Sequence, residues 1–193
     1  MSIHSYFNKL TALFSDTQVS NLEGAAITLE DGAEKAVEII LGCPKVMLIG
    51  NGGSAAITSH FHNDLVKAVG VRALVFHDVP LLTAYSNDEG YQHVYERPIE
   101  RWAEAGDLLI AISSSGRSEN ILRAAETARS LGCRIITLTG FGSHNPLRQM
   151  GELNFYTPSE SYGQVEITHL TLVHFFADFA TALVHSRSKN AGK

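Results

Sequence analysis

The sequence predicts a single α/β domain built on a five-stranded parallel sheet with helices on both faces. Five short apolar segments, most of them rich in β-branched residues, alternate with stretches in which apolar residues recur every three or four positions. This alternation is typical of βαβ units, whose parallel strands are buried on both faces. The chain has 193 residues, 45% hydrophobic and 18% charged, so one core can bury most of its apolar surface. We therefore assign residues 1–193 to one domain.

The domain is expected to begin with a purely helical extension over residues 1–43. Phe7, Leu10 and Phe14 form one apolar stripe at helical spacing, and a second stripe runs from Ala33 to Leu41. Extra apolar helical surface either completes the core of a monomer or forms contacts in a homo-oligomer. The pattern leaves both possibilities open.

The α/β core is expected over residues 44–160. Its strands are short, apolar and mostly followed by Gly or Ser, which predicts burial in a parallel sheet. A final long helix with one apolar face is expected over residues 161–186. The predicted strands are residues 45–50, 72–76, 107–113, 134–140 and, with the weakest pattern, 152–157.

Composition excludes several classes of function. The formal net charge of −5 argues against a nucleic-acid binder, which would show a basic patch. The two cysteines, Cys43 and Cys133, each lie beside a predicted strand, as packed thiols in a reducing compartment would. No signal-peptide pattern opens the sequence, and no continuous apolar run approaches the length of a membrane span. We expect a cytoplasmic protein without nucleic-acid or membrane partners.

A glycine-rich loop follows the first core strand. It comprises Gly50, Asn51, Gly52, Gly53 and Ser54, and it opens a helix. Glycines let a ligand approach the backbone, and the free N–H groups of a helix N-terminus favour an anion. The alternative is a glycine-rich turn that binds nothing. The loop matches neither a Walker A motif nor the dinucleotide fingerprint.

A serine-rich loop follows the third core strand. Because ligands of open α/β sheets bind outside the carboxyl ends of the strands, this loop and the glycine-rich loop belong to one site. One serine would suffice to cap the next helix, which is the structural alternative. Several hydroxyls suit a phosphate group better, since its oxygens need several donors from one side. The loop contains Ser113, Ser114, Ser115, Gly116 and Ser118.

Two further pairs of residues are candidates for chemistry. His60 and Asp64 lie at positions i and i+4 of a predicted helix, so they share a face. They can be metal ligands, an acid–base pair or a simple helix-surface pair. In the last helix, Glu166 and His174 are separated by about 12 Å along the axis and could just reach one ion. A lone histidine on an apolar face, as His174 is, is otherwise usually a core residue.

Together these stretches resemble the phosphoheptose isomerase branch of the SIS (sugar isomerase) family over nearly the whole chain. Order and spacing carry the resemblance, since no single stretch is decisive. The resemblance implies a flavodoxin-like parallel sheet and a homotetramer with active sites at subunit interfaces, and some members of the family bind zinc. It also implies isomerisation of sedoheptulose 7-phosphate to D-glycero-D-manno-heptose 7-phosphate through an enediol(ate). The matching stretches are residues 50–54, His60 with Asp64, residues 86–88, 107–118, 134–140 and 166–174.

The resemblance also assigns roles to individual residues. Asp64 and His174 are implied as the catalytic pair, Asp64 as base and His174 as ligand or acid. The implied Zn²⁺ ligands are His60, Asp64, Glu166 and His174. The implied substrate-binding residues are Asn51, Gly52, Gly53, Ser54, Asn87, Asp88, Ser113, Ser114, Ser115, Ser118 and Glu166.

At two of these positions the chain departs from the family pattern, which has Glu in place of Asp64 and Gln in place of Glu166. Both departures keep oxygen donors, so a two-histidine, two-carboxylate zinc site stays chemically sound. The rival function is that of the non-catalytic SIS regulators that bind DnaA. These lack the helix carboxylate and the late histidine, whereas this chain has Asp64 and His174. An isomerase for another sugar phosphate is a third possibility.

Overall fold

A seven-stranded sheet forms the centre of the computed structural model, which describes residues 2–191, with side chains through residue 188. The strand order is β2-β1-β7-β6-β5-β3-β4. Strands β4, β3, β5, β6 and β7 pair in parallel, which confirms the five predicted parallel strands. The strands are β1 (Gln18–Asn21), β2 (Ala26–Ile27), β3 (Val46–Gly50), β4 (Ala73–Val75), β5 (Leu108–Ser113), β6 (Arg134–Thr139) and β7 (Leu153–Tyr156).

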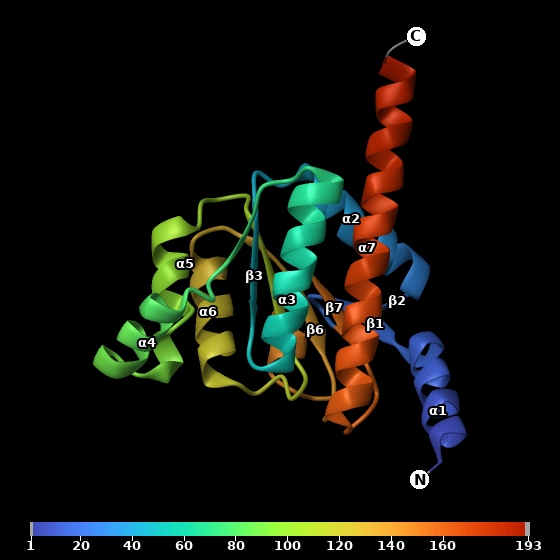
Figure 1. Ribbon diagram of the computed structural model, residues 1–193, viewed down its shortest axis with the longest axis horizontal. Coiled ribbons are helices and arrows are strands. Elements are labelled where there is room, and N and C mark those ends of the chain that lie inside the picture. Colours follow the sequence, from blue (N-terminus) through green and yellow to red (C-terminus); the bar gives the residue numbers. More distant parts are fainter. Residues whose placement is uncertain (1, 192–193) are drawn as a thin grey trace.

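Helices cover both faces of the sheet, as predicted (Figure 1). One face packs on α2, α3 and α7, and the other packs mainly on α5 and α6. The α-helices are α1 (Ile3–Asp16), α2 (Leu29–Gly42), α3 (Gly53–Asp64), α4 (Val79–Asp88), α5 (Glu96–Trp102), α6 (Glu119–Ser130) and α7 (Tyr162–Ala191). A π-helix, η1 (Leu65–Val69), continues α3, and two 3₁₀ turns are η2 (Tyr91–His93) and η3 (Leu147–Gln149).

The prediction that residues 1–43 are purely helical is wrong. Between α1 and α2 the chain forms a hairpin, β1 and β2, and β1 adds to the sheet antiparallel to β7. The turn is built by Asn21, whose side chain accepts from the Ala25 N–H, and by Gly24, whose φ is +81°. Val19 of β1 is buried in the core. The sheet is therefore mixed rather than purely parallel.

The two helices of the extension play different parts. The stripe on α2 is buried, with Ala36, Val37 and Ile40 fully inaccessible, so α2 completes the core of the subunit. On α1 the only buried residue is Leu13, and Phe7 is exposed. Of the two alternatives that the sequence left open, completion of the core holds for α2, whereas α1 carries exposed apolar side chains.

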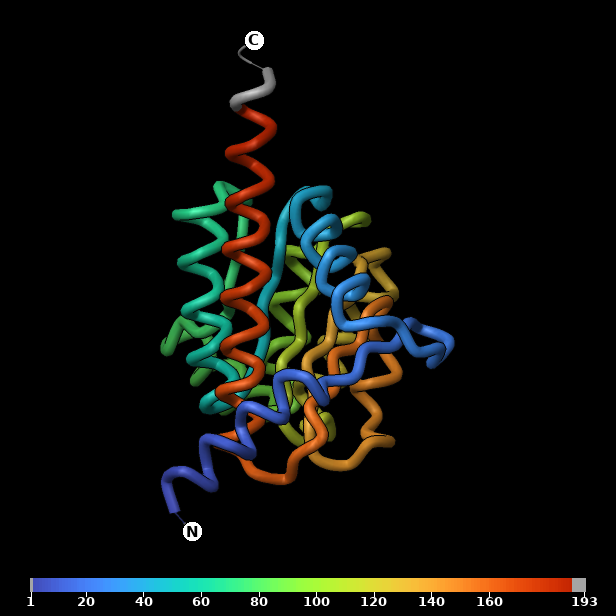
Figure 2. Tube along the Cα trace, turned by 90° about the vertical axis from the view of Figure 1, so that its right-hand side faces the viewer, coloured from blue at the N-terminus to red at the C-terminus, as the bar shows by residue number. Residues whose placement is uncertain are grey.

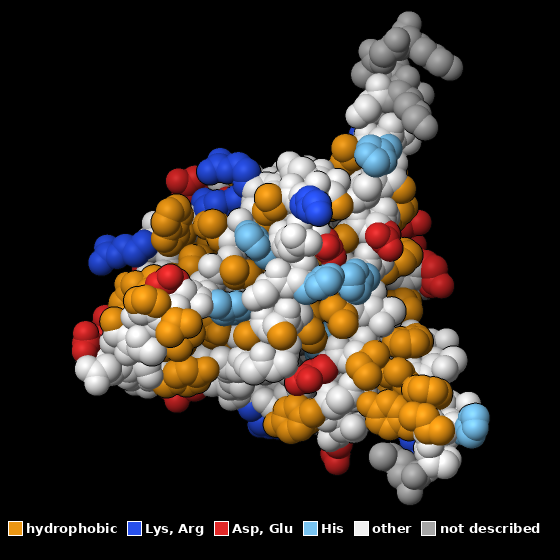
Figure 3. Space-filling model, viewed as in Figure 1, with side chains coloured by type: hydrophobic (Ala, Val, Ile, Leu, Met, Phe, Trp, Pro, Cys, Tyr) orange, Lys and Arg blue, Asp and Glu red, His pale blue; other side chains and the backbone are white. Residues whose placement is uncertain are grey.

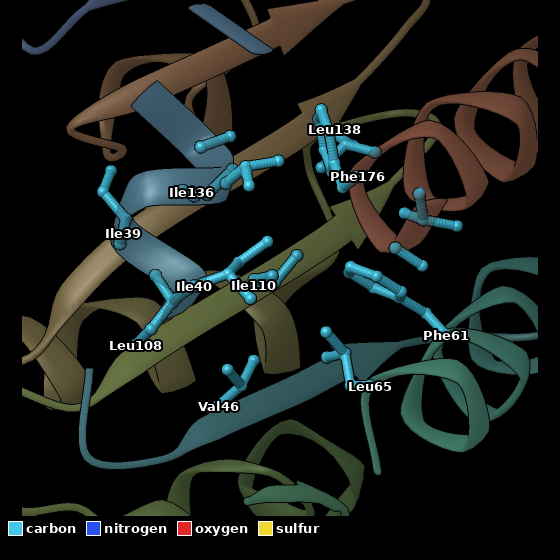
Figure 4. Close-up of a cluster of buried hydrophobic side chains, with 14 of the residues drawn as sticks. Ile39, Ile40, Val46, Phe61, Leu65, Leu108, Ile110, Ile136, Leu138 and Phe176 are labelled. Carbon is cyan, nitrogen blue, oxygen red and sulfur yellow. The ribbon is translucent and has the colours of Figure 1, made fainter. Parts of the chain in front are cut away.

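The core between the sheet and α2, α3 and α7 is continuous (Figure 4). Strand residues such as Val46, Leu108 and Ile136 meet Phe61 and Leu65, from α3 and η1, and Phe176 of α7 (Figure 4). Close-packed aromatic and branched side chains leave α3 and α7 little freedom to shift relative to the sheet. These two helices carry the candidate site.

Helix α7 is the longest element and extends beyond the body of the domain (Figures 1 and 2). Its segment Tyr162–Ser188 is long and apolar enough, by length and composition, to cross a membrane. One face of this helix packs in the core of the domain, where Val173, Phe176 and Ala180 are buried. The long helix predicted over residues 161–186 is thus confirmed and continues to Ala191.

Candidate active site

The two loops singled out from the sequence lie side by side at the carboxyl edge of the sheet. Strand β3 leads into the glycine-rich loop and β5 into the serine-rich loop, and these strands are neighbours, with Gly50 opposite Ile112. Between the loops lies a small polar cavity of about 140 Å³. It is lined by Asn51, Ser54, Ser113, Ser114, Ser115, Ser118, Tyr162 and Glu166.

The glycine-rich loop needs its glycines for geometric reasons. Gly52 has φ +55° and ψ −121°, a conformation that side-chain-bearing residues avoid. A Cβ at Gly50 would collide with the backbone of Ser54, which the chain crosses closely at this turn. The loop is held by Asn51, whose side chain exchanges two hydrogen bonds of 2.9 Å with Asn120. Asn51 Oδ1 also accepts from the Tyr91 hydroxyl at 2.9 Å, so this residue supports the loop.

The serine-rich loop is fixed by its packing against Asn145, in the segment that follows β6. Gly116 has φ +61°, and a Cβ there would collide with the Asn145 side chain. Asn145 in turn donates to the carbonyl oxygens of Gly140 and Gly142. Ser113 Oγ accepts from the Gly116 N–H at 3.2 Å, so this hydroxyl is used to shape the loop.

Two other hydroxyls of this loop have no partner among the residues that the structure describes. Ser114 Oγ is buried without a hydrogen bond, and Ser118 stands at the N-cap of α6 without making a side-chain cap. Buried polar groups are normally paired, so a hydroxyl that lines a cavity without a protein partner is available to a bound molecule. Helix capping therefore does not account for these serines. The hydroxyls and the N-terminal N–H groups of α6 suit a phosphate group.

Glu166 lies at the serine cavity. Its carboxylate packs so closely on Gly53 that a Cβ at residue 53 would collide with it. Gly53 is the first residue of α3, and a negative charge at a helix N-terminus is stabilised by the helix dipole. In this conformation Glu166 lines the serine cavity and is not part of the group formed by His60, Asp64 and His174.

A second group of polar side chains joins α3 and α7 farther along both helices. Asp64 Oδ2 lies 3.5 Å from His60 Nε2 and 3.4 Å from His174 Nδ1. The two imidazole rings meet edge to face, with centroids 4.6 Å apart. Asp64 is mostly shielded, with 20% of its side chain exposed, whereas His174 is 44% exposed and therefore not a core residue. Histidine side chains lie on the face that α3 and α7 form (Figure 3).

This group suits a divalent metal. One ligand atom from each of the three residues lies within 4.8 Å of the others. Tetrahedral zinc with ligand bonds of about 2.0–2.2 Å separates its donors by roughly 3.4 Å. The two Asp64–histidine distances match that spacing. Two imidazole nitrogens and one carboxylate form a donor set of the kind that catalytic zinc sites use, with a fourth position left open.

The other histidine of α7 in this region has a structural role. His169 is fully buried, and its Nε2 lies 3.1 Å from the Thr139 carbonyl oxygen. Burial lowers the pKa of His169 to about 4, so the ring stays neutral under ordinary conditions. The ring contacts the backbone at the carboxyl end of β6 and is not part of the group formed by His60, Asp64 and His174.

Asn87 and Asp88 belong neither to the lining of the serine cavity nor to the other candidate site residues on α3 and α7. They end α4, are exposed, and share a hydrogen bond of 2.7 Å from Asn87 Nδ2 to Asp88 Oδ1. Asp88 stands three residues before Tyr91, whose hydroxyl reaches Asn51. The pair therefore lies on the chain segment that borders the site without lining its cavity.

Several supporting residues escaped the sequence analysis. Asn120, Tyr91 and Asn145 hold the two loops, and Tyr162 lines the cavity from the first turn of α7. Nothing in the local pattern marks the first three, because each contacts a loop that is distant in sequence: Asn120 and Tyr91 bond to Asn51, and Asn145 packs on Gly116. Tyr162 could have been found, since it opens a helix that starts at the same edge of the sheet.

Comparison with known proteins gives a consistent result. Residues 5–140 match the SIS domain. A phosphoheptose isomerase of Aliarcobacter butzleri is 37% identical over 152 residues, which cover 76% of this chain and 80% of that protein. A solved phosphoheptose isomerase from Francisella tularensis superposes with a TM-score of 0.82 at 27% identity, covering 93% of this chain and 96% of that one. A phosphoheptose isomerase from Neisseria gonorrhoeae superposes with a TM-score of 0.80 at 26% identity, covering 93% and 97% of the two chains.

Proposed function

The chain belongs to the SIS domain family and, within it, to the phosphoheptose isomerases, and from this membership we propose that it interconverts sedoheptulose 7-phosphate and D-glycero-D-manno-heptose 7-phosphate. The observation that carries the proposal is the placement of two complementary groups along α3 and α7. The serine cavity lies at the first turns of both helices. The His60–Asp64–His174 group lies about 10–12 Å farther along them, from the helical rise.

This separation suits a phosphorylated seven-carbon sugar. With the phosphate among the serines, an extended sugar chain reaches the imidazole and carboxylate groups with its C1–C2 end. Binding energy from the distant phosphate then holds the reacting carbons against these groups, which is how remote contacts accelerate a reaction. A shorter sugar phosphate anchored at the same serines would leave its carbonyl short of Asp64.

We infer that Asp64 is the base. Both histidines approach its Oδ2, whereas Oδ1 accepts only from the exposed Asn63 amide, at 3.2 Å. Oδ1 is therefore the oxygen available to remove the proton from C1 of the ketose. The electrons of that C–H bond form the C1–C2 double bond of an enediol(ate), while His174 donates a hydrogen bond or proton to the C2 oxygen. Return of the proton from Asp64 to C2, while the C1 hydroxyl gives its proton to His174 and becomes the carbonyl oxygen, completes the aldose and restores both residues.

Zn²⁺ is the proposed metal, held by His60, Asp64 and His174, with Glu166 as the proposed fourth ligand. Supporting this choice are the donor types and their spacing. When bound, zinc would supply Lewis-acid polarisation of the sugar carbonyl. Glu166 would have to turn from Gly53 towards His174, eight residues farther along α7, to join the set.

The rival function is a regulator that binds a sugar phosphate without converting it. Such a regulator would need only the serine cavity to bind the sugar phosphate, so the presence of that cavity does not distinguish a regulator from an isomerase. The assembled His60–Asp64–His174 group does, because a binding protein has no need of a base beside two imidazoles. Isomerase activity is therefore the function that the geometry supports best.

The assay that tests the proposal uses sedoheptulose 7-phosphate in D₂O, followed by NMR. An isomerase exchanges the C1 proton and forms the aldose, with deuterium entering at C2. Exchange at C1 without the expected aldose would identify an isomerase for another sugar. A protein that binds the sugar phosphate but exchanges no proton would be a regulator.

The metal proposal gives a first quantitative prediction. Protein purified without chelators should carry about one zinc ion per chain by elemental analysis. His60→Ala and His174→Ala should each lose it, since removing one of three ligands greatly weakens a zinc site. The matched control is His62→Ala, on the same helix but outside the group. Zinc-free wild-type protein that neither binds nor responds to added Zn²⁺ would contradict the metal and leave the acid–base proposal intact.

A homotetramer in the cytoplasm is the proposed form of the enzyme. Apolar side chains gather over α1 and the neighbouring part of α7 (Figure 3). Phe7, Phe175 and Ile167 are among the exposed large hydrophobic residues. Such a patch commonly marks an interface between subunits. We expect light scattering to give about four times the chain mass of 21.0 kDa, and Phe7→Asp with Phe175→Asp to reduce it to smaller species. A monomeric wild type would contradict this assembly.

A further inference from the structure

A second cavity lies at the opposite edge of the sheet from the candidate active site. Its volume is about 650 Å³, within the range of small-molecule sites. It borders the amino ends of β3 and β4, the turn after η1 and the end of α5. Its lining includes Lys45, Arg72, Arg101, Trp102 and Glu104, together with Val66, Gly70 and Val71.

One cationic side chain of this cavity is paired with carboxylates, and two are not, among the residues described. Lys45 is buried and forms an ion pair with the fully buried Asp107, and it lies 3.7 Å from Glu104. Arg72 and Arg101 form no ion pair within residues 2–188. Both arginines are exposed at the mouth of the cavity, so their guanidinium groups are available to form charge-assisted hydrogen bonds with an anionic ligand such as phosphate. Lys and Arg side chains gather at the α5 end of the molecule (Figure 3).

An aromatic side chain accompanies these cations. Trp102 is the only tryptophan of the chain, and 56% of it is exposed although it is the largest apolar residue type. An exposed tryptophan beside arginines offers a flat surface on which an aromatic ring can stack. Phosphate binding alone would need no such surface.

The wall of the cavity connects it to the candidate active site. Val66 belongs to the π-helix η1, which begins directly after Asp64, and Gly70 closes that turn with φ +81°. Such π-turns are rare and occur frequently at functional sites. A ligand that contacts Val66 and Gly70 would therefore touch the segment that holds Asp64 in place.

From these observations we propose that the amino-edge cavity binds a nucleoside phosphate, with its phosphate on Arg72 and Arg101 and its base stacked on Trp102. The site is distinct from the serine cavity at the carboxyl edge. It goes beyond the proposed isomerase activity and does not depend on it.

AMP is the probe, titrated into the purified full-length chain. Binding should quench the Trp102 fluorescence and release or absorb heat in calorimetry. Arg72→Gln with Arg101→Gln should weaken AMP binding at least tenfold, because each arginine contributes charge-assisted hydrogen bonds to phosphate. Trp102→Leu, followed by calorimetry, should also weaken it. Adenosine and inorganic phosphate should each bind more weakly than AMP, because each lacks one half of the contacts.

Two control variants establish that AMP binds at this cavity and not elsewhere on the chain. Arg123→Gln removes an exposed arginine of α6 that lies outside the cavity and should leave AMP binding unchanged. Ser114→Ala with Ser118→Ala disables the serine cavity and should also leave it unchanged. The proposal is overturned if millimolar AMP gives neither quenching nor heat, or if inorganic phosphate binds as tightly as AMP. Loss of AMP binding in the serine variant would overturn it as well.

Discussion

Asp64→Asn is expected to abolish exchange of the C1 proton of sedoheptulose 7-phosphate while leaving its binding close to normal. An amide cannot accept the proton, and loss of a general base typically costs about 10²- to 10⁴-fold in rate. Binding persists because the serine cavity lies about 10–12 Å away along the helices. Asn63 and the two histidines keep polar partners, so we expect little change in folding.

The measurement combines NMR exchange in D₂O with calorimetric binding of the sugar phosphate. Asp31→Asn, an exposed carboxylate in the first turn of α2, serves as the matched control and should exchange normally. Equal inertness of wild type and Asp64→Asn towards every sugar phosphate they bind would mean a binding protein. Zinc content measured on the same samples shows whether a loss of rate comes from the base or from loss of the metal.

Asp64→Glu is a sharper form of the same test. It restores the residue that the phosphoheptose isomerase resemblance implies and lengthens the side chain by one methylene. If the heptose phosphate is the substrate, the longer carboxylate should preserve or raise the rate. A fall in rate with intact zinc and intact binding would indicate a site adapted to a different sugar phosphate.

The sheet was predictable because each parallel strand is a short apolar run followed by a turn. Val46–Gly50 and Leu108–Ser113 are buried along their whole length, so each appears in the sequence as an almost uninterrupted apolar run. Gln18–Asn21 was missed because only Val19 and Ser20 are buried and three of its four residues are polar. Its pairing with β7 depends on a partner more than 130 residues away, which no local pattern records.

The site was predictable to the extent that local geometry determines it. His60 and Asp64 share a face through the helical repeat alone, and the two loops follow strands that pair. The contact of His174 with Asp64 depends on how α7 packs against α3. The sequence could therefore predict only that the side chain is long enough to reach a shared ion. The conformation of Glu166 depends on the space that Gly53 leaves, which is a property of the fold.

The phosphate cavity gives the second large expected effect. Ser114→Ala with Ser118→Ala should weaken sugar-phosphate binding by about 10²- to 10⁴-fold, since each hydrogen bond to a charged group contributes about 1.5–3 kcal/mol. The free energy of unfolding should stay close to that of the wild type. Ser114 Oγ is buried without a partner, and Ser118 makes no cap, so neither hydroxyl stabilises the free protein.

The contrast with Ser113 makes the result specific. Ser113 Oγ accepts from the Gly116 N–H, so Ser113→Ala should lower the free energy of unfolding by about 1 kcal/mol, because it removes a hydrogen bond within the loop. Ser130→Ala, at the far end of α6, also removes one hydrogen bond, from its hydroxyl to the Thr127 carbonyl oxygen, and is the matched control that should leave sugar-phosphate binding unchanged. Calorimetry with the sugar phosphate and thermal unfolding of all four proteins separate the two roles. If Ser114→Ala with Ser118→Ala binds as tightly as wild type, the serine-rich loop is a structural turn, and the phosphate must bind elsewhere.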